Sequence, residues 1–187
     1  MSTPTPTDLG ARRVRPLRRR EFDRLVELGM FGDEPIELLG GELVYMSPQG
    51  SRHAWCVARL SRLLVTRLEA DEVRIQLPLA LSDVDEPEPD VAVVPAGDYR
   101  DEHPRVALLV IEVSASSLRD DVGRKVPMYA SAGVPDLWVV DVDGGRVLVH
   151  RDPRDGRYLA VEVFERGASV ALLARPQVVI ATDDILP

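Results

Sequence analysis

The feature that most constrains the fold of this chain is the order in which short apolar runs and helix-like segments follow one another. Short apolar runs bounded by polar turns are typical of buried strands, whereas apolar residues three and four positions apart are typical of an amphipathic helix. Strand-like runs occupy residues 73–81, 90–95 and 106–114, a helix-like segment follows at 117–133, and further runs occupy 136–141 and 145–151. This order predicts an α/β domain with a mixed β-sheet flanked by helices.

The segments on either side extend this pattern. They predict a helix within residues 20–32, an antiparallel hairpin with strands near 36–39 and 42–46, a long amphipathic helix over 51–70, and weaker strands at 158–164 and 177–181. The hairpin is expected because a Gly-Gly pair separates two alternating segments. The runs at 90–95 and 106–114 are expected to pair antiparallel and to be buried on both sides. Pro127 predicts a kink or an early end of its helix.

The size and composition of the chain fit one domain. Its 187 residues, 45% of them hydrophobic, are enough for a buried core, and we expect a domain over 16–187 after a flexible segment over 1–15. No apolar run approaches the roughly 18 residues that a membrane span requires, and the first residues form no apolar signal segment. Cys56 is the single cysteine, so we expect a cytoplasmic protein without a disulfide or a membrane association.

The charge balance limits how the chain could use nucleic acid. A net charge of −8 argues against a protein that coats nucleic acid through charge alone, because that mode depends on many Lys and Arg contacts to phosphates. It leaves open an enzyme that acts on nucleic acid through an acidic metal site.

Asp90 and Glu112 are the first candidate site residues. Asp90 opens one strand-like run and Glu112 lies near the end of the next, so in an antiparallel pair they fall at the same end of the ladder. Directly paired, their Cβ atoms lie about 4.5–5.5 Å apart, and two carboxylates that close need a shared proton or a divalent cation. The alternative is structural: Glu112 ends a strand at the surface and Asp90 follows an acidic, proline-rich turn.

Lys125 is the only lysine in a chain with twenty-two arginines. A helix packed back over the strand pair would bring its ammonium group to the two carboxylates. Lysine is a compact point charge, whereas the guanidinium group of arginine is broad and flat, so a role that needs a point charge resists replacement by arginine. Asp121, four residues earlier, could orient it through an i,i+4 pair. The alternative is that Lys125 has no function and lies by chance on an exposed helix face.

Three stretches, SPQGSRHAW, PDVAVV and VIEVSASSLRDDVGRKVPMYASAGVPDLWVVD, together resemble the Uma-two family of restriction-endonuclease-like proteins in the PD-(D/E)xK nuclease superfamily. The resemblance covers residues 20–165 and implies a restriction-endonuclease-like core. It also implies the site residues: Pro89 and Asp90 as the PD pair, Glu112 as the second acid, Lys125 as the lysine, Glu42 as a further acidic residue, and His53 as the histidine of the following helix.

One position departs from the wider superfamily. The lysine usually stands two residues after the second acid, where this chain has Ser114, so the lysine would reach the site from the helix. Gln76, between two apolar residues, is a further candidate for the same site.

These expectations combine into a metal-dependent nuclease that acts on nucleic acid, most simply DNA. Asp90 and Glu112 would bind Mg²⁺ or Mn²⁺, Glu42 would lie close to the ion, and Lys125 would orient the attacking water or offset negative charge. The alternative from another class is a non-catalytic nuclease fold used for dimerisation or nucleic-acid binding. Hydrolysis of a small phosphoester would use the same site. Apolar strands near the C-terminus could form the face of a homodimer.

Overall fold

The computed structural model describes residues 14–69, 72–114 and 118–187, without the side chains of residues 118–122. Residues 1–13, most of the segment expected to be flexible, lie outside the described residues. In chain order the elements are α1 (Arg19–Glu27), β1 (Ile36–Leu39), β2 (Glu42–Tyr45), α2 (Ser51–Arg67), β3 (Val73–Ile75), β4 (Val91–Val93), β5 (Leu109–Ser114), α3 (Leu118–Ser131), β6 (Asp136–Asp141), β7 (Arg146–Arg154), β8 (Arg157–Glu165), β9 (Ser169–Leu172), β10 (Arg175–Ala181) and a short 3-10 helix (Thr182–Asp184).

The central sheet has six strands in the order β3-β4-β5-β6-β7-β8. The β5–β6 pair is parallel and the other neighbours are antiparallel, which confirms the expected mixed sheet and the antiparallel pairing of β4 with β5. Strands β1–β2 and β9–β10 form separate antiparallel hairpins. The β1–β2 hairpin turns at Gly40 and Gly41, both with positive φ, as the Gly-Gly pair predicts.

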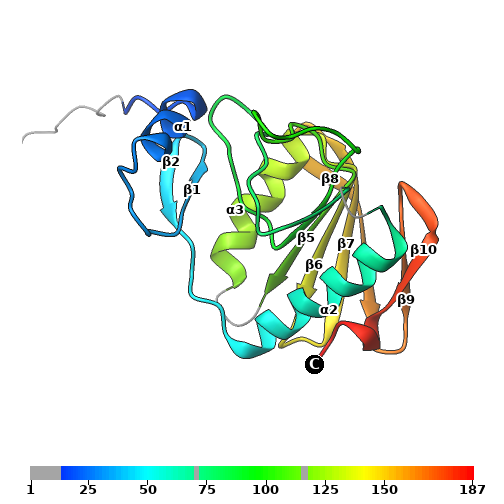
Figure 1. Cartoon of the computed structure of the whole chain (residues 1–187). Coiled ribbons are helices and arrows are strands. Elements are labelled where there is room, and N and C mark those ends of the chain that lie inside the picture. Colours follow the sequence, from blue (N-terminus) through cyan, green and yellow to red (C-terminus); the bar gives the residue numbers. More distant parts are fainter. Residues whose placement is uncertain (1–13, 70–71, 115–117) are drawn as a thin grey trace, which may run out of the picture.

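Helices α2 and α3 cover opposite faces of this sheet (Figure 1). Successive side chains of a strand point to opposite faces, so Ile111 joins the core under α2 while Val110 joins the core under α3. The β9–β10 hairpin completes the α2 side through Val170 and Ile180. Strand β5 is therefore buried on both faces, as its near-continuous apolar run predicts.

Helix α3 continues past Pro127 to Ser131, so the early end that the proline suggested is wrong. Proline removes one backbone hydrogen bond and crowds the preceding turn. Burial of the following turn opposes this effect, because Tyr129 and Ala130 are packed in the core. Tertiary packing keeps the helix intact across the proline.

The run at 73–81 forms a shorter strand than expected. β3 ends at Ile75 because Gln76 adopts a left-handed backbone conformation with φ 49°. The residues beyond it bond to loops instead, with the Leu79 amide donating to the Pro87 carbonyl and the Ala80 amide to that of Pro104. Strand β9 was not predicted at all. No helix within the described ranges has the length and hydropathy that crossing a membrane requires.

Candidate active site

A cleft of about 630 Å³ lies where the β1–β2 hairpin, the start of α2, the ends of β4 and β5, and α3 meet. Its walls combine residues of the 46–50 segment with a set of polar side chains from other parts of the chain. Those polar side chains belong to Glu37, His53, Gln76, Glu88, Asp90, Glu112, Ser114 and Lys125. The cleft therefore gathers acidic, basic and amide groups from six parts of the chain.

Asp90 and Glu112 reach the cleft as neighbours on adjacent strands. In the antiparallel β4–β5 ladder Val91 pairs with Ile111, and one further step in the same register sets Asp90 opposite Glu112. The Val113 amide donates to Oδ2 of Asp90 at 2.8 Å, which holds the aspartate at the end of the ladder. Two carboxyl groups are thus fixed side by side by the sheet itself.

Asp90 is also held from α2 and from the end of β3. The Nε2 atom of His53 lies 3.0 Å from Oδ2 of Asp90, and the side-chain amide of Gln76 donates to Oδ1 at 3.4 Å. The hydrogen bond to Asp90 raises the pKa of His53, although burial of the imidazole acts in the opposite direction. The Nδ1 atom of His53 is buried and has no hydrogen-bond partner among the described residues. The left-handed backbone of Gln76 is strained for a non-glycine residue, and such strain is often found at functional sites.

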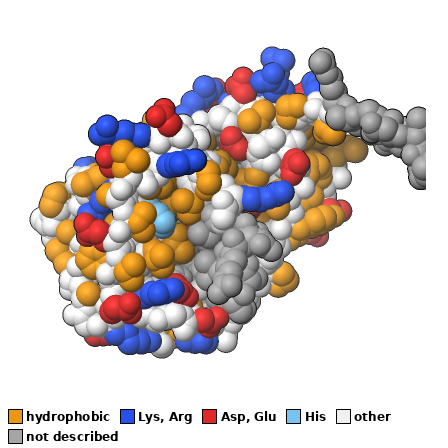
Figure 2. Space-filling model, turned by 180° about the vertical axis from the view of Figure 1, so that it is seen from behind, with side chains coloured by type: hydrophobic (Ala, Val, Ile, Leu, Met, Phe, Trp, Pro, Cys, Tyr) orange, Lys and Arg blue, Asp and Glu red, His pale blue; other side chains and the backbone are white. Residues whose placement is uncertain are grey.

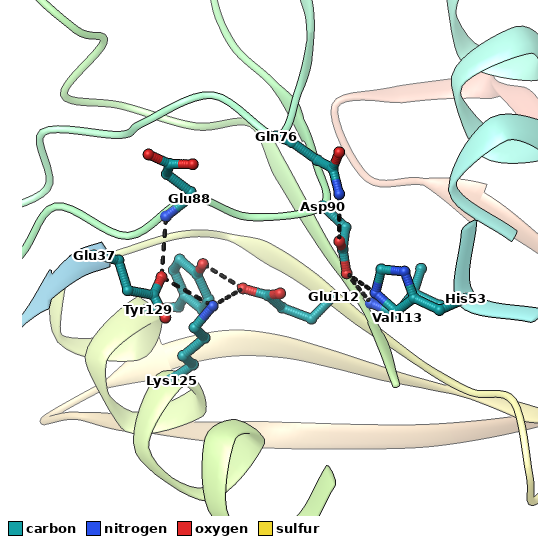
Figure 3. A network of polar contacts seen from close by, with 9 residues as sticks. All are labelled: Glu37, His53, Gln76, Glu88, Asp90, Glu112, Val113, Lys125 and Tyr129. Atoms are coloured by element: carbon teal, nitrogen blue, oxygen red, sulfur yellow. Dashed lines mark hydrogen bonds and ion pairs between the residues drawn. The ribbon is translucent and has the colours of Figure 1, made fainter. Parts of the chain in front are cut away.

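Lys125 lies at the centre of a second set of contacts, which we call the lysine network: Glu37, Glu112, Lys125 and Tyr129 (Figure 3). The Nζ atom of Lys125 lies 3.1 Å from Oε2 of Glu37 and 3.4 Å from Oε1 of Glu112. The Tyr129 hydroxyl donates to the same Oε1 at 2.6 Å. The Lys125 side chain is only 10% exposed, so the expected alternative of a solvent-exposed lysine is wrong.

Burial shifts the protonation equilibria of this network. It raises the pKa of Glu112 to about 7, with a further contribution from Asp90, while the attraction of Lys125 acts in the opposite direction. Burial lowers the pKa of Lys125, but the carboxylates of Glu112 and Glu37 outweigh it and leave that pKa raised. Lys125 is therefore a permanent cation, whereas Glu112 exchanges a proton near neutral pH.

The cleft has more acidic groups than cationic ones. Glu88 adds a further carboxyl group, whose pKa is raised by burial and by Glu37, so four carboxyl groups of the lining face Lys125 and His53. No group of three or more His, Cys, Asp or Glu side chains within the described ranges is arranged to hold a metal ion. Two carboxylates are nevertheless a sufficient protein ligand set for Mg²⁺, which keeps water and substrate phosphate as its other ligands.

The structure brings most of the predicted site residues together but not all of them. Those that line the cleft are Asp90, Glu112, Lys125, His53, Gln76 and Ser114. Glu42 does not: its side chain is 67% exposed and lies 3.4 Å from Arg124, outside the lining. Its expected place beside the metal ligands is corrected, since Glu37 of the same hairpin is the acid that enters the cleft. Asp121 lies on α3, but its side chain is outside the described part of the structure.

Sequence reasoning missed Glu37, Glu88 and Tyr129. Glu37 carried a usable signal, because it interrupts the apolar segment IELL in the same way that Glu112 interrupts VIEV. A charge inside an apolar run is costly unless it is paired, which applies equally to both residues. Tyr129 carried no such signal, since a tyrosine in an amphipathic helix is an ordinary core residue.

The fold and this site define a restriction-endonuclease-like protein, with a mixed sheet whose central strands deliver an aspartate and a glutamate to one cleft. The family model described as "Putative restriction endonuclease" (Uma2) matches residues 19–183. The chain therefore belongs to this family.

A solved structure from Anabaena variabilis ATCC 29413, described as "a putative nuclease belonging to DUF820", has the same fold. The TM-score is 0.71 at 18% sequence identity, and the match covers 91% of this chain and 97% of the other. The comparison with curated proteins found no match.

Proposed function

We propose that this protein is a metal-dependent endonuclease that hydrolyses DNA phosphodiester bonds. The observation that carries the proposal is the convergence of Asp90, Glu112 and Lys125, from three separate elements, in one cleft. Membership of the family described as "Putative restriction endonuclease" supports the same reaction class. Carboxyl groups outnumber cationic groups in the cleft, which favours a divalent cation that binds the carboxylates and the substrate phosphate together.

Asp90 and Glu112 are the residues that would hold Mg²⁺ or Mn²⁺. They are hard oxygen donors, adjacent on the sheet, and the two contacts of Glu112 within the lysine network both use Oε1 rather than Oε2. Such an ion, when bound, lowers the pKa of a water ligand and offsets phosphate charge. The positions of these two carboxylates determine where the ion would bind.

Lys125 supplies a positive charge that does not titrate at physiological pH. Its ammonium group can hold the attacking water by donating hydrogen bonds, or donate to a phosphate oxygen as negative charge builds up. Glu37 and Glu112 keep the group in place and protonated. We therefore assign Lys125 an orienting and electrostatic role rather than that of a general base.

His53 and Gln76 position Asp90 rather than act on substrate. Together with the Val113 amide they fix both carboxylate oxygens. Outer partners of this kind orient the ligands of a metal and tune its affinity.

The test compares two glutamates that the structure separates. Glu112→Gln is expected to lose both Mn²⁺ binding by isothermal titration and nicking of supercoiled plasmid in Mg²⁺ or Mn²⁺, whereas Glu42→Gln keeps both. Equal activity in the two variants would show that the cleft does not carry the reaction. Branched and single-stranded DNA, and RNA, in the same assay define the substrate.

A non-catalytic nuclease fold is the second candidate, and the lysine network is the observation that favours it. Lys125 and Tyr129 already hold Oε1 of Glu112 without any ion. Metal binding separates the two candidates: wild-type protein that takes up no Mn²⁺ in a manner sensitive to Asp90→Ala would support the scaffold. Under either candidate we propose nucleic acid as the ligand, a homodimer as the assembly and the cytoplasm as the location.

A further inference from the structure

Strand β8 (Arg157–Glu165) forms an open edge of the central sheet. It pairs with β7 on one side and is the last strand in the sheet order. In the described part of the chain, residues 158–164 make no backbone hydrogen bonds other than those of the β7 ladder. Because every second residue of an antiparallel edge strand turns its peptide group away from the ladder, residues 158–164 present a row of unpaired N–H and C=O groups, the arrangement that another strand can extend.

The side chains of β8 are unusually apolar for a free edge. Leu159 is 60% exposed, and Val161 and Val163 are each 50% exposed. Natural edge strands are commonly protected by lysines, prolines or short length. The opposite edge, β3, has only three residues, so it is protected by length while β8 is not. Figure 2 shows hydrophobic side chains gathered around a histidine on the side of the molecule turned away from Figure 1.

The sequence of β8 is complementary to itself when read in the antiparallel direction. With the pairing centred on Val161, Leu159 meets Val163, and the two ends bring together opposite charges, Arg157 and Glu165. Tyr158 then lies opposite Phe164, a favourable aromatic pair. A two-fold axis repeats each of these pairs, because it applies the same contact in both directions.

Neighbouring registers lose this complementarity. A pairing centred on Ala160 sets Asp155 against Glu165, and one centred on Glu162 sets Leu159 against Glu165. Like charges or a charge on an apolar residue directly opposite are unfavourable. Within the described residues neither Arg157 nor Glu165 is in an ion pair, so both are free to make one across the axis.

We propose that β8 pairs antiparallel with β8 of a second copy of this chain, centred on Val161, and joins two central sheets into one continuous sheet. The occupant is a second copy rather than a foreign strand, because the charges at the two ends of β8 are complementary to each other. The interface covers the exposed side chains of Leu159, Val161 and Val163. It does not depend on nuclease activity and holds whether or not the cleft is catalytic.

Charge reversal with rescue tests this interface. Arg157→Glu and Glu165→Arg each place two like-charged pairs across the axis, and each is expected to weaken the dimer about tenfold or more in sedimentation equilibrium. The double variant Arg157→Glu with Glu165→Arg restores both pairs and is expected to recover wild-type association. Arg62→Glu, on the exposed face of α2, is the matched control and leaves association unchanged.

A second measurement does not depend on any variant. Amide hydrogen exchange of residues 158–164 is expected to slow as the wild-type protein concentration rises, because pairing across the axis protects the outward amides. A wild-type monomer at all accessible concentrations, or a double variant no tighter than the single ones, overturns the proposal. So does exchange at β8 that is independent of concentration.

Discussion

Two buried carboxylates of this protein, Asp136 and Glu112, are surrounded very differently. Asp136, at the start of β6, is fully buried, and both of its oxygens accept hydrogen bonds from Arg151, with Trp138 and the Leu173 amide as further donors. Arg151 also donates to the Ala171 carbonyl. One carboxylate thus ties the β9–β10 hairpin to the central sheet.

Glu112 is less well stabilised as a carboxylate than Asp136. It shares Lys125 with Glu37, and Asp90 lies beside it, so burial and repulsion raise its pKa to about 7. A carboxylate with every donor supplied is typical of a structural role, whereas one whose pKa is raised toward neutral pH is typical of a functional site. The following predictions test that difference, from the largest expected effect to the smallest.

Asp136→Ala should lower the free energy of unfolding by about 3–5 kcal/mol, because it leaves the partly buried Arg151 without its counter-ion. Urea denaturation followed by circular dichroism measures the loss. Glu102→Ala, which removes an exposed ion pair with Arg105, is the control and should change stability by less than about 0.5 kcal/mol. Equal effects of the two substitutions would contradict the structural role of Asp136.

Lys125→Ala should slow plasmid nicking by about 10²–10³-fold, the usual effect of losing one preorganised electrostatic group. Lys125→Arg should recover less than a tenth of the wild-type rate, because a planar guanidinium cannot replace a point charge between Glu37 and Glu112. Full activity of the arginine variant would show that position 125 needs only a positive charge.

Glu112→Gln should gain stability relative to wild type as the pH rises. The folded-state pKa of about 7 lies above the ordinary carboxyl value, so between roughly pH 4.5 and 7 the folded wild type binds more protons than the unfolded chain and loses stability with increasing pH. The variant lacks this titration. By pH 8 the difference should have moved about 1–3 kcal/mol in its favour, and a pH-independent difference in urea midpoints would contradict the environment described for Glu112.

His53→Ala should weaken Mn²⁺ binding about tenfold, because Asp90 loses one of the groups that orient it but keeps the Val113 amide. His53→Gln should recover part of the affinity by donating to the same oxygen. Isothermal titration measures both. An unchanged affinity in the alanine variant would make His53 a packing residue only.

Much of the fold could be predicted from local patterns. The Gly-Gly pair fixed the β1–β2 turn, and the apolar runs of β4, β5 and β6 identified the centre of the sheet. Strand β9 and the shortening of β3 could not be predicted in this way. They depend on contacts with distant segments, such as the Arg151 bond to Ala171 and the loop bonds of Leu79.

The same distinction between local sequence patterns and distant contacts applies to the candidate site. The sequence by itself determined that Asp90 and Glu112 lie at the same end of an antiparallel strand pair, because each acid stands at the matching end of one of two adjacent apolar runs. Only the tertiary structure decided which glutamate of the β1–β2 hairpin joins them. Glu37 reaches Lys125 and Glu42 reaches Arg124, two successive residues of α3, and the docking of a hairpin on a helix is set by shape and burial across the chain rather than by neighbouring residues.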